Sequence, residues 1–262
     1  MHKIKTIIKK EWAEVFKNRM VLFTVIFLPL LLTALPLIIL GVTRSSGATN
    51  MNSELPSQMN ALCPAGMNSG DCFQVSLVSQ FMLMFMILPL AIPATISAYS
   101  IVGEKTTRSL EPLLATPITT EELLIGKGLA AAIPAILATY AAFLIYAIGA
   151  WILTPNKAVF LAMMDARWLV AIFIVGPLMA ILAITISMMI SSRVNDPRVA
   201  EQLSMMVILP VLAVFFGQIS GLFIVNRQFV SLMAFVLVII DAIMIYLAVR
   251  VFQREVILTR WR

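Results

Sequence analysis

The sequence predicts an all-α polytopic membrane protein. We expect six transmembrane helices, an N-terminal amphipathic interfacial helix and a cytoplasmic segment between the second and third spans. Of the 262 residues, 61% are apolar and only 12% are charged, whereas soluble domains contain about 45–50% apolar and about 25% charged residues. The apolar residues also form uncharged runs that reach the roughly 20 residues needed to cross a bilayer. These two observations exclude a soluble enzyme and a secreted disulfide scaffold.

The uncharged runs define where the spans should lie. We expect them at residues 20–43, 77–102, 128–153, 168–191, 202–225 and 228–250. An external loop would occupy residues 44–76, and residues 251–262 would form a cytoplasmic tail. The segments outside these spans are too short for a separate soluble domain of roughly 100 residues, so residues 1–262 should form one transmembrane domain.

The positive charges predict the orientation of the chain. With six spans, both termini lie on one side, and that side carries 15 of the 19 Lys and Arg residues. The other four are Arg44, Lys157, Arg167 and Arg227. The positive-inside rule therefore places both termini in the cytoplasm. The net charge of +6 reflects this topology and attraction to anionic lipid, and no aromatic–basic groove pattern indicates nucleic-acid binding.

Residues 1–19 have the pattern of an amphipathic helix. Ile4, Ile8, Trp12 and Phe16 share one face at helical spacing, and lysines line the other. Such a helix lies in the headgroup plane, with its lysines directed toward lipid phosphates. The alternative interpretation is a plain topology signal.

The two cysteines both fall in the predicted external loop. Cys63 and Cys72 flank a segment rich in the turn-forming residues Gly, Pro and Asn. Because disulfides persist in oxidising compartments, we expect a Cys63–Cys72 bond that stabilises the loop by about 2–3 kcal/mol. Two free thiols are the alternative. A metal site is not expected, because the only histidine is His2.

The segment at 103–127, GEKTTRSLEPLLATPITTEELLIGK, is the most patterned stretch outside the spans. Its apolar side chains can share a helical stripe that ends at a Thr-Pro break: Leu110, Leu113, Leu114, Ile118 and, at the break, Thr116 and Pro117. Thr119 and Glu122 then match a capping box that begins a new helix. An exposed apolar stripe needs a partner surface. Packing against the N-terminal helix is the alternative, and both contacts are compatible.

A second segment, before the fifth span, also contains a helix start. In SSRVNDPRVAEQL, Asp196 matches an N-cap and Pro197 the first helical position.

These motifs together resemble the ABC-2 type permease family. The segment at 103–127 contains Gly-Glu, Leu-Glu-x-Leu-Leu, Thr-Pro and Gly-Lys in the family's order. The stretch SSRVNDPRVAEQL is similar to the one before the family's fifth span, and the ending AVRVFQREVILTRW resembles that of sodium-exporter and drug-exporter permeases. The resemblance covers nearly the whole chain, whereas the loop at 44–76 matches nothing recognisable.

The resemblance implies the membrane-spanning half of a type V-like ABC exporter in a prokaryotic plasma membrane. A second permease, identical or different, and two copies of a separate ATPase would complete it, with ATP and Mg²⁺ bound by the ATPase. The N-terminal helix would be the connecting helix. A broken element before the last span would fall near Gly217, Ser220 and Gly221. The ATPase-coupling residues would be Glu104, Arg108, Leu110, Glu111, Leu113, Leu114, Thr116 and Pro117, with a second contact at Asp196 and Pro197.

The residues themselves argue against an enzyme. A phosphate-binding P-loop needs Gly-x-x-x-x-Gly-Lys-Ser/Thr. The only Gly-Lys pair is Gly126-Lys127, with Glu121 where the first glycine belongs and Gly128 where Ser or Thr is required. A His-Glu-x-x-His protease motif is also missing, and the expected spans contain one acid rather than the pair an aspartyl protease uses. No catalytic residue is predicted.

That one acid is Asp241. A charge at the bilayer centre costs about 2.5–3.5 kcal/mol, so Asp241 should face the bundle interior. With Gln218 it forms a candidate polar site for a cation, a proton or a polar substrate, and the structural alternative is a hydrogen bond to Gln218, Ser220 or Tyr246. An ion-coupled transporter or channel without an ATPase is the alternative function, although no internal repeat supports it. The substrate stays open.

Overall fold

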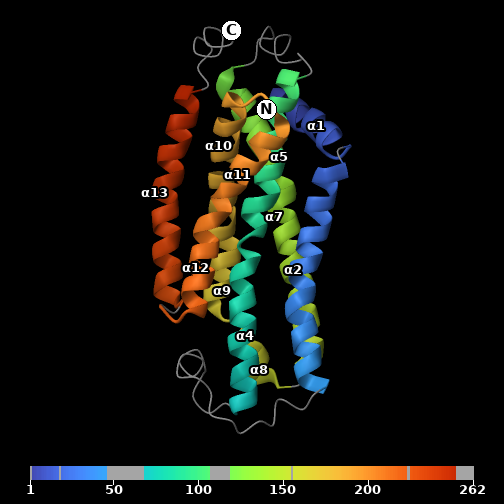
Figure 1. The fold of residues 1–262 in the computed structure, drawn as a ribbon, viewed down its shortest axis with the longest axis vertical. Helices are drawn as coiled ribbons and strands as arrows, with labels where there is room; N and C mark the ends of the chain where they lie inside the picture. The colour runs from blue at the N-terminus through green and yellow to red at the C-terminus, as the bar shows by residue number, and fades with distance from the viewer. Residues whose placement is uncertain are drawn as a thin grey trace.

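The computed structural model describes residues 2–17, 19–45, 68–106, 119–154, 156–222 and 225–251, and these form a bundle of helices along one long axis (Figure 1). No strand occurs among these residues. Six helical segments are long and apolar enough to cross a membrane, which confirms the predicted fold class: Val21–Ser45, Ser69–Glu104, Glu121–Leu153, Lys157–Arg193, Pro197–Ile219 and Arg227–Val251.

The α-helices have the following bounds: α1 His2–Val15, α2 Arg19–Ser45, α4 Ser69–Phe85, α5 Leu88–Thr106, α7 Thr120–Leu153, α8 Lys157–Met163, α9 Ala166–Val170, α10 Gly176–Arg193, α11 Pro197–Ser204, α12 Leu209–Ile219 and α13 Arg227–Val251. A π-helical turn, η2 (Ala171–Val175), joins α9 to α10, and a 3₁₀ turn, η3 (Met205–Ile208), joins α11 to α12.

Four spans begin at least five residues earlier than the sequence predicts, the second and the fourth by the most. The second begins at Ser69 rather than 77, and the polar side chains of Gln74 and Ser76 in the added turns are buried inside the bundle. The fourth begins at Lys157 rather than 168, since α8 and α9 continue the span. Hydropathy alone misses such turns. Their polar groups lower the mean hydropathy, but inside the protein these groups form hydrogen bonds and can be buried.

The second span is the centre of the bundle. Its most apolar window is 72% buried, against 17% for α13 and 28% for α2 and α7. Within it, α5 packs against α7, α10 and α11, and Ile92, Ala94 and Ala98 are fully enclosed. The outer helices instead present large apolar side chains on their surfaces, as a bilayer requires.

The turn between α12 and α13 contains Gly221, whereas the broken element that the resemblance implies before the last span stays a prediction. The helix α12 ends at Ile219, and Gly221 follows with a φ of 72°. A left-handed backbone of this kind is readily adopted only by glycine. Gly217, in contrast, is an ordinary position inside α12.

Candidate functional site

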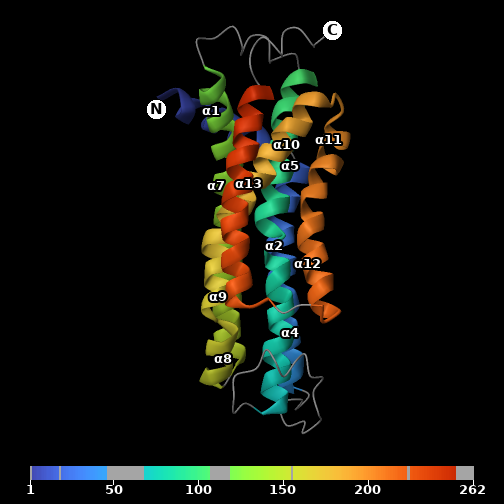
Figure 2. The same cartoon turned by 90° about the vertical axis from the view of Figure 1, so that its left-hand side faces the viewer.

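A buried group of charged side chains lies where α1 meets α5 and α7. We call it the charge cluster; it consists of Lys10, Glu11, Ser100, Glu104 and Lys127. Both views of the fold place α1 beside the ends of α5 and α7, at the end of the bundle opposite α8 (Figures 1 and 2). Three helices that are far apart in sequence are therefore joined at one end.

Lys127 is the centre of the charge cluster. Its side chain is only 2% exposed, and its ammonium nitrogen lies 2.7 Å from Glu11 Oε1 and 3.0 Å from Glu104 Oε2. It also donates to the Oγ and the backbone oxygen of Ser100, at 2.9 and 3.0 Å. One lysine on α7 therefore binds both α1 and α5.

The remaining members complete a neutral network of two ammonium groups and two carboxylates. Lys10 donates to Glu104 Oε1 over 2.7 Å, and the Ser100 hydroxyl donates to Glu11 Oε2 over 2.7 Å. Partial burial lowers the pKa of Lys10, but the hydrogen bond and charge of Glu104, with the charges of Glu14 and Glu11, outweigh it and raise the pKa overall. Lys10 therefore stays charged at neutral pH.

Close backbone packing surrounds the charge cluster. The Trp12 indole nitrogen donates to the backbone oxygen of Ala130 on α7 over 2.9 Å. A Cβ atom added at Gly126 would lie 2.9 Å from Ile7 Cγ2 and 3.0 Å from its Cβ, so α1 can approach α7 this closely only because residue 126 is glycine. The Gly-Lys pair that resembles part of a P-loop is thus a helix contact followed by a buried lysine.

The charge cluster contains residues from the helices before and after the predicted coupling segment. Glu104 lies near the end of α5, and α7 begins after Thr119 with the predicted capping box, which is confirmed. The Thr119 amide donates to Glu122 Oε2 over 3.1 Å, and the Glu122 amide donates to Thr119 Oγ1 over 3.2 Å. The two helices that enter and leave residues 107–118 are consequently held together.

Most residues predicted to contact an ATPase lie outside the described residues: Arg108, Leu110, Glu111, Leu113, Leu114, Thr116 and Pro117. Glu104 is described, and its side chain is 3% exposed and directed into the charge cluster. The contact of Glu104 with an ATPase stays a prediction. The predicted start of α11 is confirmed, since Asp196 Oδ1 accepts from the Arg198 amide over 2.8 Å and Pro197 is the first helical residue.

The face of α1 that packs on the bundle carries Ile7, Glu11 and Val15, all buried. The predicted interface residues Ile4, Ile8 and Trp12 are half-buried beside it, and Phe16 is exposed. The sequence analysis did not single out Glu11, although its position midway between Ile7 and Val15 on one helical face is the signal that identifies it. Contact between α1 and lipid headgroups stays a prediction.

The predicted pair of Asp241 and Gln218 is not brought together. Gln218 lies at the end of α12, whereas Asp241 lies 14 residues into α13 from Arg227, about 21 Å along the axis at about 1.5 Å per residue. Asp241 is 4% exposed, and neither carboxylate oxygen has a hydrogen-bond partner among the described residues. The alternative of a bond to Gln218, Ser220 or Tyr246 is therefore wrong.

At the opposite end of the bundle, Arg167 forms a polar link that the sequence analysis assigned to a loop. Its guanidinium donates to the backbone oxygen of Val225 over 3.2 Å and to Ser79 Oγ over 3.3 Å, and it pairs with Asp165 at 3.0 Å. The start of the fourth span is thereby tied to the second span and to the segment before α13. Cys72 is buried at the start of α4; Cys63 lies outside the described residues, so their pairing stays a prediction.

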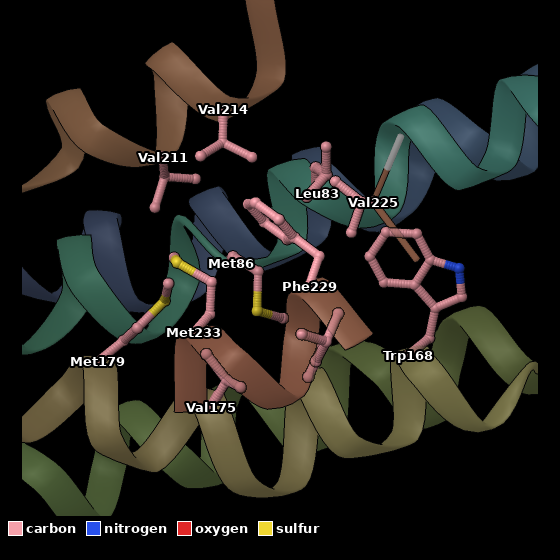
Figure 3. A pocket seen from close by; sticks show the side chains of 12 residues that line it. Leu83, Met86, Trp168, Val175, Met179, Val211, Val214, Val225, Phe229 and Met233 are labelled. Atoms are coloured by element: carbon pink, nitrogen blue, oxygen red, sulfur yellow. The ribbon is translucent and has the colours of Figure 1, made fainter. Parts of the chain in front are cut away.

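An apolar pocket lies beside Arg167, between the second span and helices α9, α10, α12 and α13 (Figure 3). It is open to the surface, and its volume of about 430 Å³ includes the open space at its mouth. Trp168, Met179, Val214, Phe229 and Met233 converge on it, and its lining exposes no polar surface. Among the described residues, no group of three His, Cys, Asp or Glu side chains is placed to hold a metal ion.

These features define a helical membrane protein whose buried polar contacts tie its spans together at both ends. Comparison with known families identifies the class further: the family described as ABC-2 family transporter protein matches residues 5–240. The chain belongs to this family and is a membrane permease component of an ABC transporter, rather than its ATPase. Such permeases generally work with an ABC ATPase partner. No curated protein matches the chain.

Proposed function

We propose that the chain is the membrane-spanning subunit of an ATP-powered exporter of the sodium-exporter and drug-exporter group. Two ATPase subunits bind ATP and Mg²⁺, and a second permease, identical or different, completes the pathway. Both termini and the α1 end of the bundle lie in the cytoplasm of a prokaryotic cell. The family match supports a permease, and the distribution of Lys and Arg supports this orientation. An ion-coupled transporter without an ATPase is not retained, because the family is that of ABC permeases.

Residues 103–122 form the contact with the ATPase in this proposal. The observation that supports it is the charge cluster, because Lys127 holds Glu104 at the end of α5 and Glu11 on α1. A displacement of the segment between α5 and α7 therefore moves α1, α5 and α7 together, instead of moving the end of one helix alone. Since the second span, which contains α5, has the most buried window of the six, the displacement reaches the centre of the permease.

The buried network also couples the movements of the three helix ends. Breaking a buried ion pair by removing one partner costs about 3–5 kcal/mol, so the three helix ends resist separation when the segment is pushed. We infer that α1, the end of α5 and the start of α7 move as one body during ATP hydrolysis.

The proposal is tested by purifying the chain with its cognate ATPase and measuring both the complex and the ATP hydrolysis it supports. Charge reversal Glu111→Lys should weaken the complex, because it changes the proposed contact. Arg227→Glu, an exposed reversal at the other end of the bundle, is the matched control and should leave the complex intact. If the wild-type chain and its ATPase never associate, or if both variants behave alike, the proposed coupling surface is wrong.

A further inference from the structure

Helices α12 and α13 follow each other in the chain but scarcely pack on each other. In the described part of the chain, α13 packs on α9, η2 and α10, and α12 packs on α4, whereas α12 and α13 make few or no close contacts with each other. Figure 2 shows the two helices standing apart, with α4 visible between them. An unfilled space between apolar helices forfeits the dispersion contacts of its lining, so the space between α12 and α13 needs an occupant.

The apolar pocket lies in this space (Figure 3). Val211 and Val214 line it from α12, and Phe229 and Met233 line it from α13. The pocket is open to the surface, and its lining exposes no polar area. Because α12 and α13 do not close over it, its opening lies between these two outer spans and faces the hydrocarbon of the bilayer.

The pocket runs along the bundle axis. Trp168 lines one end of it and Met179 the other (Figure 3). Met179 follows Trp168 by 11 residues, which corresponds to about 16 Å at about 1.5 Å per residue. One leaflet of a bilayer contributes about 15 Å, half of the hydrocarbon core of about 30 Å. The pocket therefore has the length and the direction of one acyl chain in the leaflet on the α8 side.

An unpaired cation lies at the α8-side end of the pocket. Arg227 is the first residue of α13, is exposed, and forms no ion pair with any described residue. Val230, which lines the pocket, follows it by three residues, so both residues lie on one face of α13. A long basic side chain at the end of a span extends toward the headgroup region. Arg227 is thereby at the level of the phosphate of a lipid whose chain enters the pocket.

We propose that Arg227 and the pocket between α12 and α13 bind an anionic phospholipid, with its phosphate on Arg227 and one acyl chain in the pocket. The arginine guanidinium presents a planar fork of donors that matches a phosphate group. The lipid is a resident part of the bundle that separates the fifth and sixth spans, and it is not cargo. The inference goes beyond the proposed function, because the site needs neither ATPase nor transported substrate.

The surroundings of the site select this class of lipid. A zwitterionic headgroup carries its own cation, which competes with Arg227 for the phosphate, whereas an anionic headgroup leaves the phosphate free to pair. A neutral apolar molecule would fill the pocket but would gain nothing from Arg227. A helix of a second permease that packs over the opening is the competing occupant, and it would keep lipid chains out.

The test is the quenching of Trp168 fluorescence by brominated lipid, with the full chain in phosphatidylcholine vesicles. Trp168 is 1% exposed and lines the pocket, so a brominated chain quenches it from inside the pocket. Replacing Trp12, Trp151 and Trp261 by Phe isolates its signal. Half-maximal quenching should need about two- to fivefold less brominated phosphatidylglycerol than brominated phosphatidylcholine, the range that an exposed ion pair gives.

Two variants separate the headgroup contact from the chain contact. Arg227→Gln should remove the preference for phosphatidylglycerol, and Lys157→Gln, at an exposed position of the same end, is the matched control that should keep it. Val214→Phe fills the pocket and should abolish the quenching by both lipids. Val236→Phe, at an exposed position of α13 outside the pocket, should leave the quenching unchanged.

The proposal is overturned if both lipids quench Trp168 equally at every mole fraction, or if Arg227→Gln changes the preference no more than Lys157→Gln does. Quenching by neither lipid would also overturn it, because another occupant then covers the opening. Size-exclusion profiles identify variants that fail to fold, and Arg227→Gln, at an exposed position, keeps the test decisive. Arg227 lies at the end of the bundle away from α1, so a failure here leaves the proposed coupling standing, and a failure of ATPase association leaves this site untouched.

Discussion

Removal of the Lys127 ammonium group tests the charge cluster most directly. In Lys127→Met the apolar part of the side chain is kept, but Glu11 and Glu104 lose the cation they share at 2.7 and 3.0 Å. Their side chains are only 4% and 3% exposed, so water does not replace it. An uncompensated buried charge costs about 3–5 kcal/mol, and the loss of the bonds to Ser100 adds to that cost.

The loss of stability caused by Lys127→Met should be smaller when a carboxylate is removed together with the lysine. In Glu11→Gln/Lys127→Met the network keeps the Lys10–Glu104 pair and loses one charge of each sign. We expect the double variant to be more stable than the sum of the two single changes predicts, by about 1–3 kcal/mol, the range seen for residues in one network. Lys5→Met, on an exposed position of α1, should stay within about 0.5 kcal/mol of wild type.

The assay is unfolding of the purified chain in bicelles by titration with a denaturing detergent, followed by tryptophan fluorescence. Trp12 reports on the cluster directly, because its indole is bonded to Ala130 beside Lys127. ATP hydrolysis by the complex gives a second readout, and Lys127→Met should uncouple it from the permease. The reasoning fails if Lys127→Met is no less stable than Lys5→Met, or if the double-variant cycle shows no coupling.

Three further predictions concern the ends of the helices. Thr119→Ala removes the α7 capping box and should lower unfolding stability by about 1 kcal/mol in the same titration; an unchanged midpoint would contradict it. Gly126→Ala should cost about 1–3 kcal/mol, because its Cβ would meet Ile7, and hydrogen exchange of α1 should increase. Arg167→Met leaves the Val225 oxygen and Ser79 without their donor; protease cleavage before α13 should become faster than in wild type.

The sequence predicts the features of this fold that depend on neighbouring residues. A span is an average over roughly 20 residues, and a helix cap depends on residues three apart. For this reason the six spans, the capping box at Thr119 and the N-cap at Asp196 are all confirmed. The span boundaries at Ser69 and Lys157 are missed. The added turns contain polar residues that distant parts of the chain bury, Gln74 and Ser76 in the second span and Arg167 in the fourth.

The charge cluster could not be predicted in the same way. Lys10 and Glu104 are 94 positions apart, and Lys127 and Glu11 are 116 positions apart. Taken alone, each of these residues looks like a charged residue at an ordinary end of a membrane span, where Lys and Glu side chains are hydrated. Only the packing of α1 against α7, which Gly126 permits, moves Glu11 and Lys127 out of water and into contact.

Asp241 is the opposite case: the sequence identifies the residue, but only the structure shows what surrounds it. A single acid in an apolar run is conspicuous, but the run does not say which helix faces it. In the structure α13 packs on α9, η2 and α10, and the Asp241 carboxylate has no hydrogen-bond partner among the described residues. The helix that carries the acid therefore packs on the fourth span, and the structure does not bring the acid together with Gln218.

The distribution of buried polar contacts suggests which part of the bundle can move. At the α1 end, Lys127 joins α1, α5 and α7, and at the other end Arg167 joins α9 to α4 and to the segment before α13. Between these ends, α13 is the span with the least buried window, 17%, and it packs mainly on α9, η2 and α10. A displacement delivered to α5 thus reaches α13 through α10.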